Sequence, residues 1–308
     1  MSKRYREHPS NFSEIEEYVV SDKSEVVNLL FRGNNYFFYD TCSLLHHSKI
    51  PSTSYLIQYY NSHNAMIIIT RTVLMELTSN NFEIHQTQIE FIKDLAQSGI
   101  KILIFDEELV VDALQHMIDI RNKDANLLLG YAIKEVIKPK KAVHKIMNNI
   151  GIDMKVKILG NNPGTNLLYE YFFQFARNQK VTADSLAEEL VLICIIILTK
   201  IPLGKKYIFV SDDLVIRPNV IDINTYTKKY HNVQAPYQLT TPTLVYKMFK
   251  NSIISSKEDM LAILDAAFNG NVNIYYVGET DIEQQSKPFE KIELVDRIIT
   301  EEEFRIIY

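Results

Sequence analysis

The chain lacks several residue types and pairs that mark common protein classes. Its 308 residues include no tryptophan and only two cysteines, Cys42 and Cys194, and it contains no Cys-x-x-Cys pair. Two thiols cannot build a metal cage. Because both cysteines lie in apolar stretches, we expect buried, unpaired thiols in a reducing compartment.

Long apolar segments are also missing. The N-terminal stretch MSKRYREHPSNFSEIEEY has no apolar core of the kind that a secretion signal needs. The longest apolar run, Leu190 to Leu198, is far too short to span a bilayer. We therefore expect a soluble, cytoplasmic protein without a membrane partner.

The charge balance and the absent motifs exclude further classes. The formal net charge is -5, so the chain does not coat nucleic acid by bulk charge, although a local basic groove would suffice to bind it. The eight histidines form no His-Glu-x-x-His pattern, which leaves a zinc hydrolase without support. No glycine-rich phosphate loop and no dinucleotide-binding fingerprint occur.

Short runs rich in β-branched and aromatic residues are typical of buried strands. Such runs cover residues 36–39, 66–70, 100–105 and 207–210, and a short fifth covers 220–223. Helical patterns separate them. Uniformly apolar strands that alternate with helices predict an α/β fold, with a parallel sheet covered on both faces and right-handed crossovers.

The rest of the chain divides around this core. We expect a lead-in over residues 1–30, a core over 31–234 with a helical insertion at about 109–180, and a C-terminal α+β extension over 235–308. The Pro- and Thr-rich stretch 235–244 is typical of a linker. The insertion is followed by a strong apolar helix, for which Thr182 is the expected N-cap.

Acidic residues follow the predicted strands. In an open parallel sheet, ligands bind outside the carboxyl ends of the strands, so acids placed there share one crevice. Asp184 and Glu188, four residues apart, would share one face of the apolar helix, with Asp184 in its first turn. The acids expected at this rim are Asp40, Glu76, Asp184, Glu188, Asp212 and Asp213.

Several carboxylates in one crevice repel each other, and without a counter-ion some would take up protons. Mg²⁺ or Mn²⁺ resolves this, because both prefer oxygen ligands and are typically held by a few carboxylates plus a substrate phosphate. Such a site activates water for attack on a phosphodiester. Each acid alone is explained by a cap or a turn; their common edge favours a metal site.

The order of these motifs resembles the PIN domain, a family of metal-dependent nucleases. The likeness rests on YDTCSLL after the first strand, TRTVLMEL after the second, ADSLAEELVLI at the start of a helix and FVSDDL after the fourth strand. It extends from about residue 36 to 223, interrupted by the insertion. The resemblance implies a three-layer α/β/α core with a central parallel sheet.

The same resemblance implies roles for individual residues. Thr41 and Ser211 match the small polar neighbours of the first and fourth acids, and Asp212 is an extra acid that replaces or assists Asp213. The catalytic metal ligands would be Asp40, Glu76, Asp184 and Asp213. The implied activity is Mg²⁺- or Mn²⁺-dependent endoribonuclease cleavage with metal-activated water, with RNA favoured over DNA because most members of the family cut RNA.

Two alternatives stay open or are weakened. A PIN-like module that no longer cuts, and instead binds RNA or a protein partner, is the alternative function; the complete set of mutually repelling acids argues against it. A haloacid-dehalogenase-type phosphatase also begins with an Asp after the first strand. It needs a second Asp two residues later, where this chain has Cys42.

A basic segment completes the candidate sites. Residues 134–149 carry five lysines against one acid, in an otherwise acidic chain. A phosphate backbone could be bound by Lys138, Lys140, Lys141 and Lys145, although a solvated helix face explains them as well. For the aromatic run 167–180 we favour core packing over base stacking, and for His46–His47 a surface turn. A homo-oligomer or a regulatory protein partner is left open.

Overall fold

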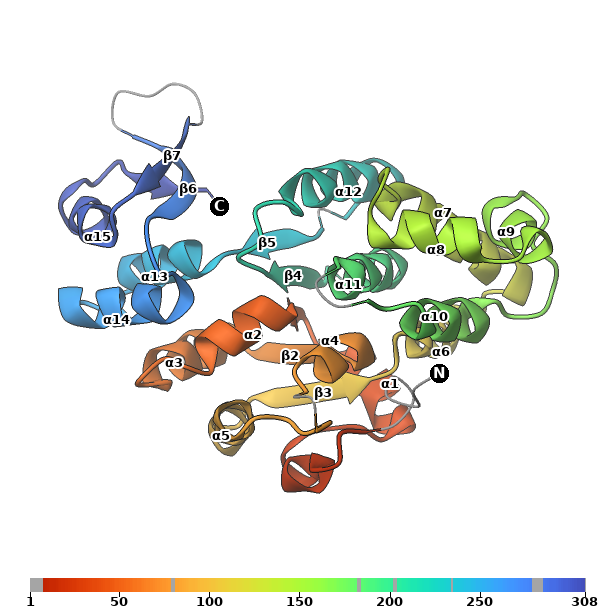
Figure 1. Cartoon of the computed structure of the whole chain (residues 1–308), viewed down its shortest axis with the longest axis horizontal. Coiled ribbons are helices and arrows are strands. Elements are labelled where there is room, and N and C mark those ends of the chain that lie inside the picture. The colour runs from red at the N-terminus through yellow and green to blue at the C-terminus, as the bar shows by residue number, and fades with distance from the viewer. Residues whose placement is uncertain are drawn as a thin grey trace.

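The computed structural model describes residues 8–78, 81–181, 184–201, 204–233, 235–278 and 285–307. Its centre is a five-stranded sheet in the order β3-β2-β1-β4-β5, in which every neighbouring pair is parallel (Figure 1). The α/β prediction with a central parallel sheet is therefore confirmed. The strands are β1 (Asn35–Tyr39), β2 (Ala65–Thr70), β3 (Lys101–Phe105), β4 (Lys206–Val210) and β5 (Tyr237–Leu239).

The direction of the strand order reverses at β1. The chain steps from β1 to β2 to β3, and then returns to place β4 on the other side of β1. At such a switch point the connections leave toward opposite faces, which opens a crevice at the carboxyl ends. Tyr39 lies opposite Val210, and the Asp40 amide donates to the Val210 carbonyl at 3.0 Å. Asp40 therefore lies in the crevice directly beside residues 211–213.

Helices flank both faces of the sheet. α3 packs on β2, α5 packs on β3 and α2 contacts α5. The elements of this first half are η2 (Phe12–Glu14), η3 (Glu16–Tyr18), α1 (Lys23–Arg32), α2 (Thr41–His47), α3 (Ser54–Ser62), α4 (Arg71–Glu76) and α5 (Gln86–Gln97).

The predicted helical insertion is present and lies at one end of the molecule (Figure 1). Its helices α7 and α9 pack closely, because a Cβ on Gly130 would lie only 2.2 Å from the carbonyl oxygen of Ile158. Tyr169, Phe172 and Phe173 are buried, so the aromatic run serves core packing as predicted. The elements are η4 (Glu107–Leu109), α6 (Val110–Met117), α7 (Asn122–Val136), α8 (Ala142–Asn149), α9 (Ile152–Leu159) and α10 (Tyr169–Asn178).

The apolar helix that follows, α11 (Leu186–Leu198), runs through the core. All of its residues are buried, and it contacts helices α4, α6, α7, α8 and α12. Each fully buried Leu or Ile side chain contributes about 1.5–3 kcal/mol relative to an exposed one, so this helix holds its acidic N-terminal end rigidly. The expected N-cap, Thr182, lies outside the described residues.

Two predictions about the second half of the core are wrong. Residues 220–223 are not a strand but part of α12 (Arg217–His231), which has Pro218 in its first turn, a favoured helix start. Residues 235–244 are not a linker. They contain β5, which is hydrogen-bonded to β4, and they enter α13 (Thr241–Lys250). The fifth strand therefore lies within the Pro- and Thr-rich stretch. It is too short to show the alternating pattern by which a strand is predicted from sequence.

The C-terminal extension forms an α+β unit at the end opposite the insertion (Figure 1). It has a three-stranded antiparallel sheet in the order β7-β6-β8, and α14 contacts α2 of the core. Its further elements are α14 (Lys257–Ala267), β6 (Val272–Val277), β7 (Gln285–Phe289), α15 (Lys291–Thr300) and β8 (Arg305–Ile306). In the part of the chain that the structure describes, no helix combines the length and apolarity needed to cross a bilayer.

Candidate active site

Asp40 lies at the base of the crevice as the N-cap of α2. Its side chain is fully buried, and Oδ1 accepts a hydrogen bond from the Ser43 amide at 2.6 Å. Oδ2 makes no hydrogen bond of ordinary geometry within the described chain. Burial raises the pKa of Asp40 to about 7, although the Ser211 hydroxyl and the Ser43 amide act to lower it. The site therefore holds a carboxylate with one oxygen still lacking a partner.

Glu76 lies at the end of α4 and is held by two neighbours. Thr41, the small polar residue that follows Asp40, donates a hydrogen bond from its hydroxyl to Oε2 of Glu76. The Lys180 ammonium contacts Oε1 of Glu76 and also contacts Oδ1 of Asp184. Burial raises the pKa of Glu76 above its usual value, and Lys180 and Thr41 only partly offset this. A lysine thus lies between two of the predicted metal ligands.

Asp184 does not occupy the first turn of a helix as predicted. α11 begins at Leu186, so the i and i+4 relation of Asp184 to Glu188 does not place both on one helical face. The Asp184 carboxylate instead accepts the amides of Val181 at 3.0 Å and Leu186 at 3.1 Å. It closes the turn that leads into α11, in addition to its contact with Lys180.

Glu188 belongs to the first turn of α11 and points into the acidic crevice. Its side chain is 9 % exposed, and Oε2 has no hydrogen-bond partner within the described chain. Burial, followed by the charges of Glu76 and Asp40, raises the pKa of Glu188 to about 8. Glu188 is therefore a second buried acid that makes no ion pair within the described chain, and the charge of Lys180 only partly offsets its burial.

The environment of Cys42 shows that the acids converge. Cys42 is exposed, not buried as predicted, whereas Cys194 is buried. Partial burial of the thiol raises the pKa of Cys42 to about 12, and the negative charges of four carboxylates add to this effect. The four carboxylates are those of Asp40, Glu188, Glu76 and Asp213. Four acids from four separate segments therefore lie near Cys42; Asp184, a ligand predicted from the sequence, is not one of them.

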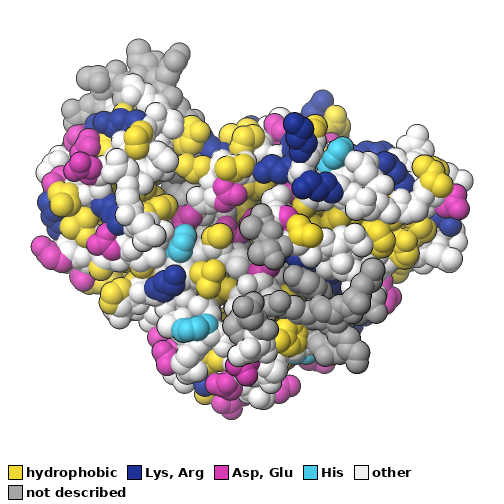
Figure 2. Space-filling view, viewed as in Figure 1, with side chains coloured by type: hydrophobic (Ala, Val, Ile, Leu, Met, Phe, Trp, Pro, Cys, Tyr) yellow, Lys and Arg dark blue, Asp and Glu magenta, His cyan; other side chains and the backbone are white. Residues whose placement is uncertain are grey.

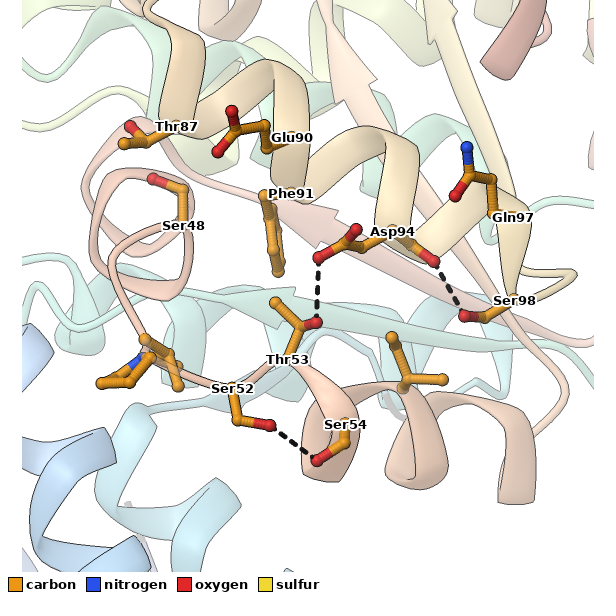
Figure 3. A pocket seen from close by; sticks show the side chains of 13 residues that line it. Ser48, Ser52, Thr53, Ser54, Thr87, Glu90, Phe91, Asp94, Gln97 and Ser98 are labelled. Atoms are coloured by element: carbon orange, nitrogen blue, oxygen red, sulfur yellow. Dashed lines mark hydrogen bonds between the residues drawn. The ribbon is translucent and has the colours of Figure 1, made fainter.

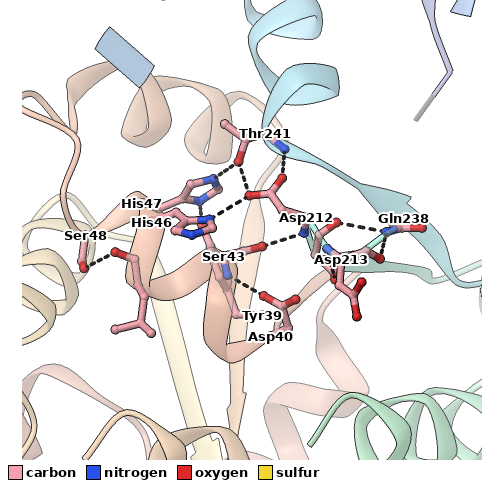
Figure 4. Close-up of polar contacts among 12 residues, drawn as sticks. Tyr39, Asp40, Ser43, His46, His47, Ser48, Asp212, Asp213, Gln238 and Thr241 are labelled. Atoms are coloured by element: carbon pink, nitrogen blue, oxygen red, sulfur yellow. Dashed lines mark hydrogen bonds and ion pairs between the residues drawn. The ribbon is translucent and has the colours of Figure 1, made fainter. Parts of the chain in front are cut away.

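Both oxygens of Asp212 have partners (Figure 4), as do those of Glu76 and Asp184. The Thr241 amide donates to Oδ1 at 2.6 Å and its hydroxyl to Oδ2 at 2.7 Å, and His46 Nδ1 lies 3.2 Å from Oδ2. Burial acts to raise the pKa of Asp212, but His46, His47 and Thr241 outweigh it and lower the pKa. Asp212 therefore joins the crevice to α13, with both of its oxygens already hydrogen-bonded.

The histidine pair is not a surface turn. His47 is fully buried, with Nδ1 2.8 Å from the Tyr39 hydroxyl and Nε2 3.0 Å from Thr241 Oγ1. Burial lowers the pKa of His47 to about 4, so the ring is neutral at pH 7. Together with His46 it connects β1 to the start of the C-terminal unit, across Asp212 (Figure 4).

Asp213 lies half-buried at the rim of the crevice. Its Oδ1 accepts the Val215 amide at 2.7 Å, and its own amide donates to the Ser211 hydroxyl at 3.2 Å. Gln238 of β5 donates to the carbonyls of Ser211 and Asp213 at 3.0 and 3.2 Å. The fifth strand therefore braces the loop that carries the fourth acid.

An ion cluster that the sequence analysis missed supports the crevice from behind. Arg177 is buried and contacts Glu107 at 2.6 Å and Glu108 at 2.6 and 2.7 Å. Glu107 is fully buried and also accepts the Thr72 amide at 2.8 Å. This cluster ties α10, η4 and α4 together, and so it positions Lys180 relative to Glu76.

The basic segment precedes and enters α8. Lys138 pairs with Asp222 of α12 at 2.7 Å, whereas Lys140 and Lys145 are exposed. In Figure 2, Lys and Arg side chains gather over the part of this face that α12, α7 and α8 occupy in Figure 1. The lysines therefore lie on an accessible surface, with one of the four engaged in an ion pair.

A buried glutamate connects this segment to the acids. Glu189 accepts the amides of Ala142 at 3.2 Å and Val143 at 2.8 Å, at the N-terminus of α8. Burial raises the pKa of Glu189, and Lys141 is among the groups that act to lower it. Glu189 therefore ties the start of α8 to the first turn of α11, which also carries Glu188.

The acids are not arranged as a finished metal shell. Among residues 8–307, leaving out those that the structure does not describe, no group of three or more His, Cys, Asp or Glu side chains is spaced to hold a metal ion. Asp40 Oδ2 and Glu188 Oε2 are nevertheless buried acceptors that lack a partner in the described chain. Hard divalent cations prefer such oxygens, so these residues fit Mg²⁺ or Mn²⁺.

A separate polar hollow lies between α3 and α5 (Figure 3). Its side chains bond to each other: the Thr53 hydroxyl donates to Asp94 at 3.1 Å, and the Ser52 and Ser54 hydroxyls lie 2.8 Å apart. None of the six predicted acids lines it. This hollow is therefore separate from the six acids predicted as ligands.

Comparisons of the chain with protein-family models, curated proteins and solved structures found no match. The site must therefore be interpreted from its own residues.

Proposed function

We propose that this protein is a Mg²⁺- or Mn²⁺-dependent nuclease with a PIN-like core, and that it cleaves RNA as an endoribonuclease. The observation that supports this function is the pair of buried carboxylate oxygens without partners, Asp40 Oδ2 and Glu188 Oε2, at the switch point of a parallel sheet. Buried like charges persist only with a counter-charge. A divalent cation supplies it.

The residues of the crevice divide the work. A bound cation polarises a phosphate and lowers the pKa of water. Asp40 and Glu188 would hold it through their buried oxygens that lack a partner in the described chain. The Ser43 amide fixes the Asp40 carboxylate, so the second oxygen of Asp40 has a defined direction. Because Asp40 and Glu188 are buried, charge interactions at these carboxylates are stronger than in bulk water.

Lys140 and Lys141 would hold the phosphate backbone beside this centre. Replacing both by Gln should weaken binding of single-stranded RNA about equally for all sequences. Because each lost phosphate contact reduces counter-ion release, the slope of log affinity against log salt should fall by about 0.7 per lysine. Lys101→Gln, on an exposed lysine at the start of β3, serves as control. An unchanged slope in a salt titration would remove these lysines from the RNA path.

A divalent cation should stabilise the protein more at high pH than at low pH. Burial raises the pKa of Asp40 to about 7 and that of Glu188 to about 8, whereas unfolded carboxyls titrate near 4. The cation-free folded protein thus holds protons that the unfolded chain has lost. Its free energy of unfolding therefore falls as the pH rises from about 4 to about 8. A cation binds the ionised carboxylates and offsets this loss.

Thermal denaturation with and without Mg²⁺, at pH values about two units below and just above these pKa values, measures the effect. At about 100 times its Kd, the cation should add about 2.7 kcal/mol at the higher pH and little at the lower. Glu188→Gln should remove most of the difference. A Mg²⁺ shift of equal size at both pH values would count against the metal site.

The presence of Lys180 between Glu76 and Asp184 favours one alternative, a module that binds RNA or a protein partner without cutting. Lys180 neutralises two of the predicted ligands without any metal. Incubating single-stranded RNA with the protein and Mn²⁺, and in parallel with EDTA, separates the two functions. Cleavage that EDTA abolishes supports the nuclease. Binding without cleavage, and without stabilisation by Mn²⁺, supports the binding module.

A further inference from the structure

Lys180 is a buried cation whose hydrogen-bond donors are all in use. Its side chain is 3 % exposed, and it lies between Glu76 and Asp184. Besides the two carboxylates, the ammonium donates to the Asp184 carbonyl at 3.1 Å. An ammonium has three protons to donate, so all of them are used. Burial acts to lower the pKa of Lys180, but the two acids outweigh it and raise the pKa, so the group stays charged.

The partners of Lys180 divide the acids into two sets. Glu76 and Asp184 have a fixed counter-charge and close hydrogen bonds, also from Thr41 and from two backbone amides. Asp40 and Glu188 make no ion pair within the described chain, and each keeps one buried oxygen without a partner there. Two-metal nucleases place two cations about 3.5–4 Å apart among such acids. Here Lys180 already supplies a positive charge to two of the acids.

We propose that this crevice binds a single divalent cation through Asp40 and Glu188, and that Lys180 takes the place of a second one by holding Glu76 and Asp184. This assignment rests on the proposed function, and it adds how many cations the site takes and which acids bind them. Lys180 is a positioning residue: it keeps two acids neutralised, so that the cation binds only on the side of Asp40.

The closing experiment counts Mn²⁺ ions per chain by isothermal titration and by the electron paramagnetic resonance signal of free Mn²⁺, in the full-length protein. The wild type should bind one ion. Lys180→Gln, which keeps length but removes charge, should bind two, because Glu76 and Asp184 then need a new counter-charge. Lys101→Gln should bind one, as the matched control. Two ions on the wild type would overturn the role of Lys180, as would one ion on a folded Lys180→Gln.

A second pair of variants does not depend on whether Lys180→Gln folds. Glu76→Gln should keep the single Mn²⁺ site with an affinity within about threefold of the wild type, because Glu76 holds Lys180 and not the cation. Glu188→Gln should lose at least tenfold in affinity. The reverse order would overturn the division of the acids. No Mn²⁺ binding to the wild type would instead overturn the proposed function, so the two failures are distinguishable.

Discussion

Asp40→Asn should lower cation-dependent RNA cleavage by more than about 100-fold while the protein stays folded. Loss of a residue that only supports a metal ligand already costs about 10–100-fold, and a direct ligand should cost more. Asn keeps the acceptor for the Ser43 amide, so the N-cap of α2 is retained. It removes the negative charge of a fully buried side chain. A cleavage assay with Mn²⁺, run beside urea denaturation, measures both effects.

The stability of Asp40→Asn separates a metal site from a structural role. Because the buried carboxylate lacks a partner on Oδ2, removing its charge should leave the cation-free protein at least as stable as the wild type near pH 8. Asp153→Asn, on the exposed face of α9, is the matched control and should change neither quantity. A folded Asp40→Asn that cleaves within a few-fold of the wild type would remove Asp40 from the reaction.

The core strands and the acidic rim were predictable because each depends on short-range signals. β1 to β4 are runs of β-branched and aromatic residues long enough to be distinguished from loops. Asp40 and residues 211–213 follow two of these runs directly, and parallel strands place such residues at one edge whatever their order. Asp40, Glu76, Glu188 and Asp213 all raise the pKa of Cys42, which is in line with their lying at one edge.

The missed features depend on tertiary contacts. β5 has three residues, too few for a periodic pattern, and it is defined by its pairing with β4. Lys180 reads as one more lysine at a helix end, and only the folding of the insertion brings it to Glu76. Asp184 reads as a first-turn acid, although α11 begins two residues later. Charge pairs across separate segments carry no local signal.

The position of Lys180 in turn depends on Arg177, which anchors the end of α10. Arg177 lies three residues before Lys180 and forks onto Glu108 while its Nη1 also contacts Glu107. Glu107 passes this connection to α4 through the Thr72 amide. The buried guanidinium of Arg177 therefore links α10, which precedes Lys180, to α4, which carries Glu76.

Arg177→Met should lower the free energy of unfolding by about 3–5 kcal/mol, because it leaves the fully buried Glu107 without its cation. Urea denaturation followed by circular dichroism measures the loss. The free energy of unfolding of Arg177→Lys should lie between those of the wild type and Arg177→Met, because an ammonium cannot reproduce the planar hydrogen bonding of the guanidinium to both glutamates. The double variant Arg177→Met with Glu107→Gln should recover much of the stability, because no uncompensated charge stays buried. If the free energy of unfolding of Arg177→Met were within about 1 kcal/mol of the wild-type value, the cluster would not hold α10 against the core.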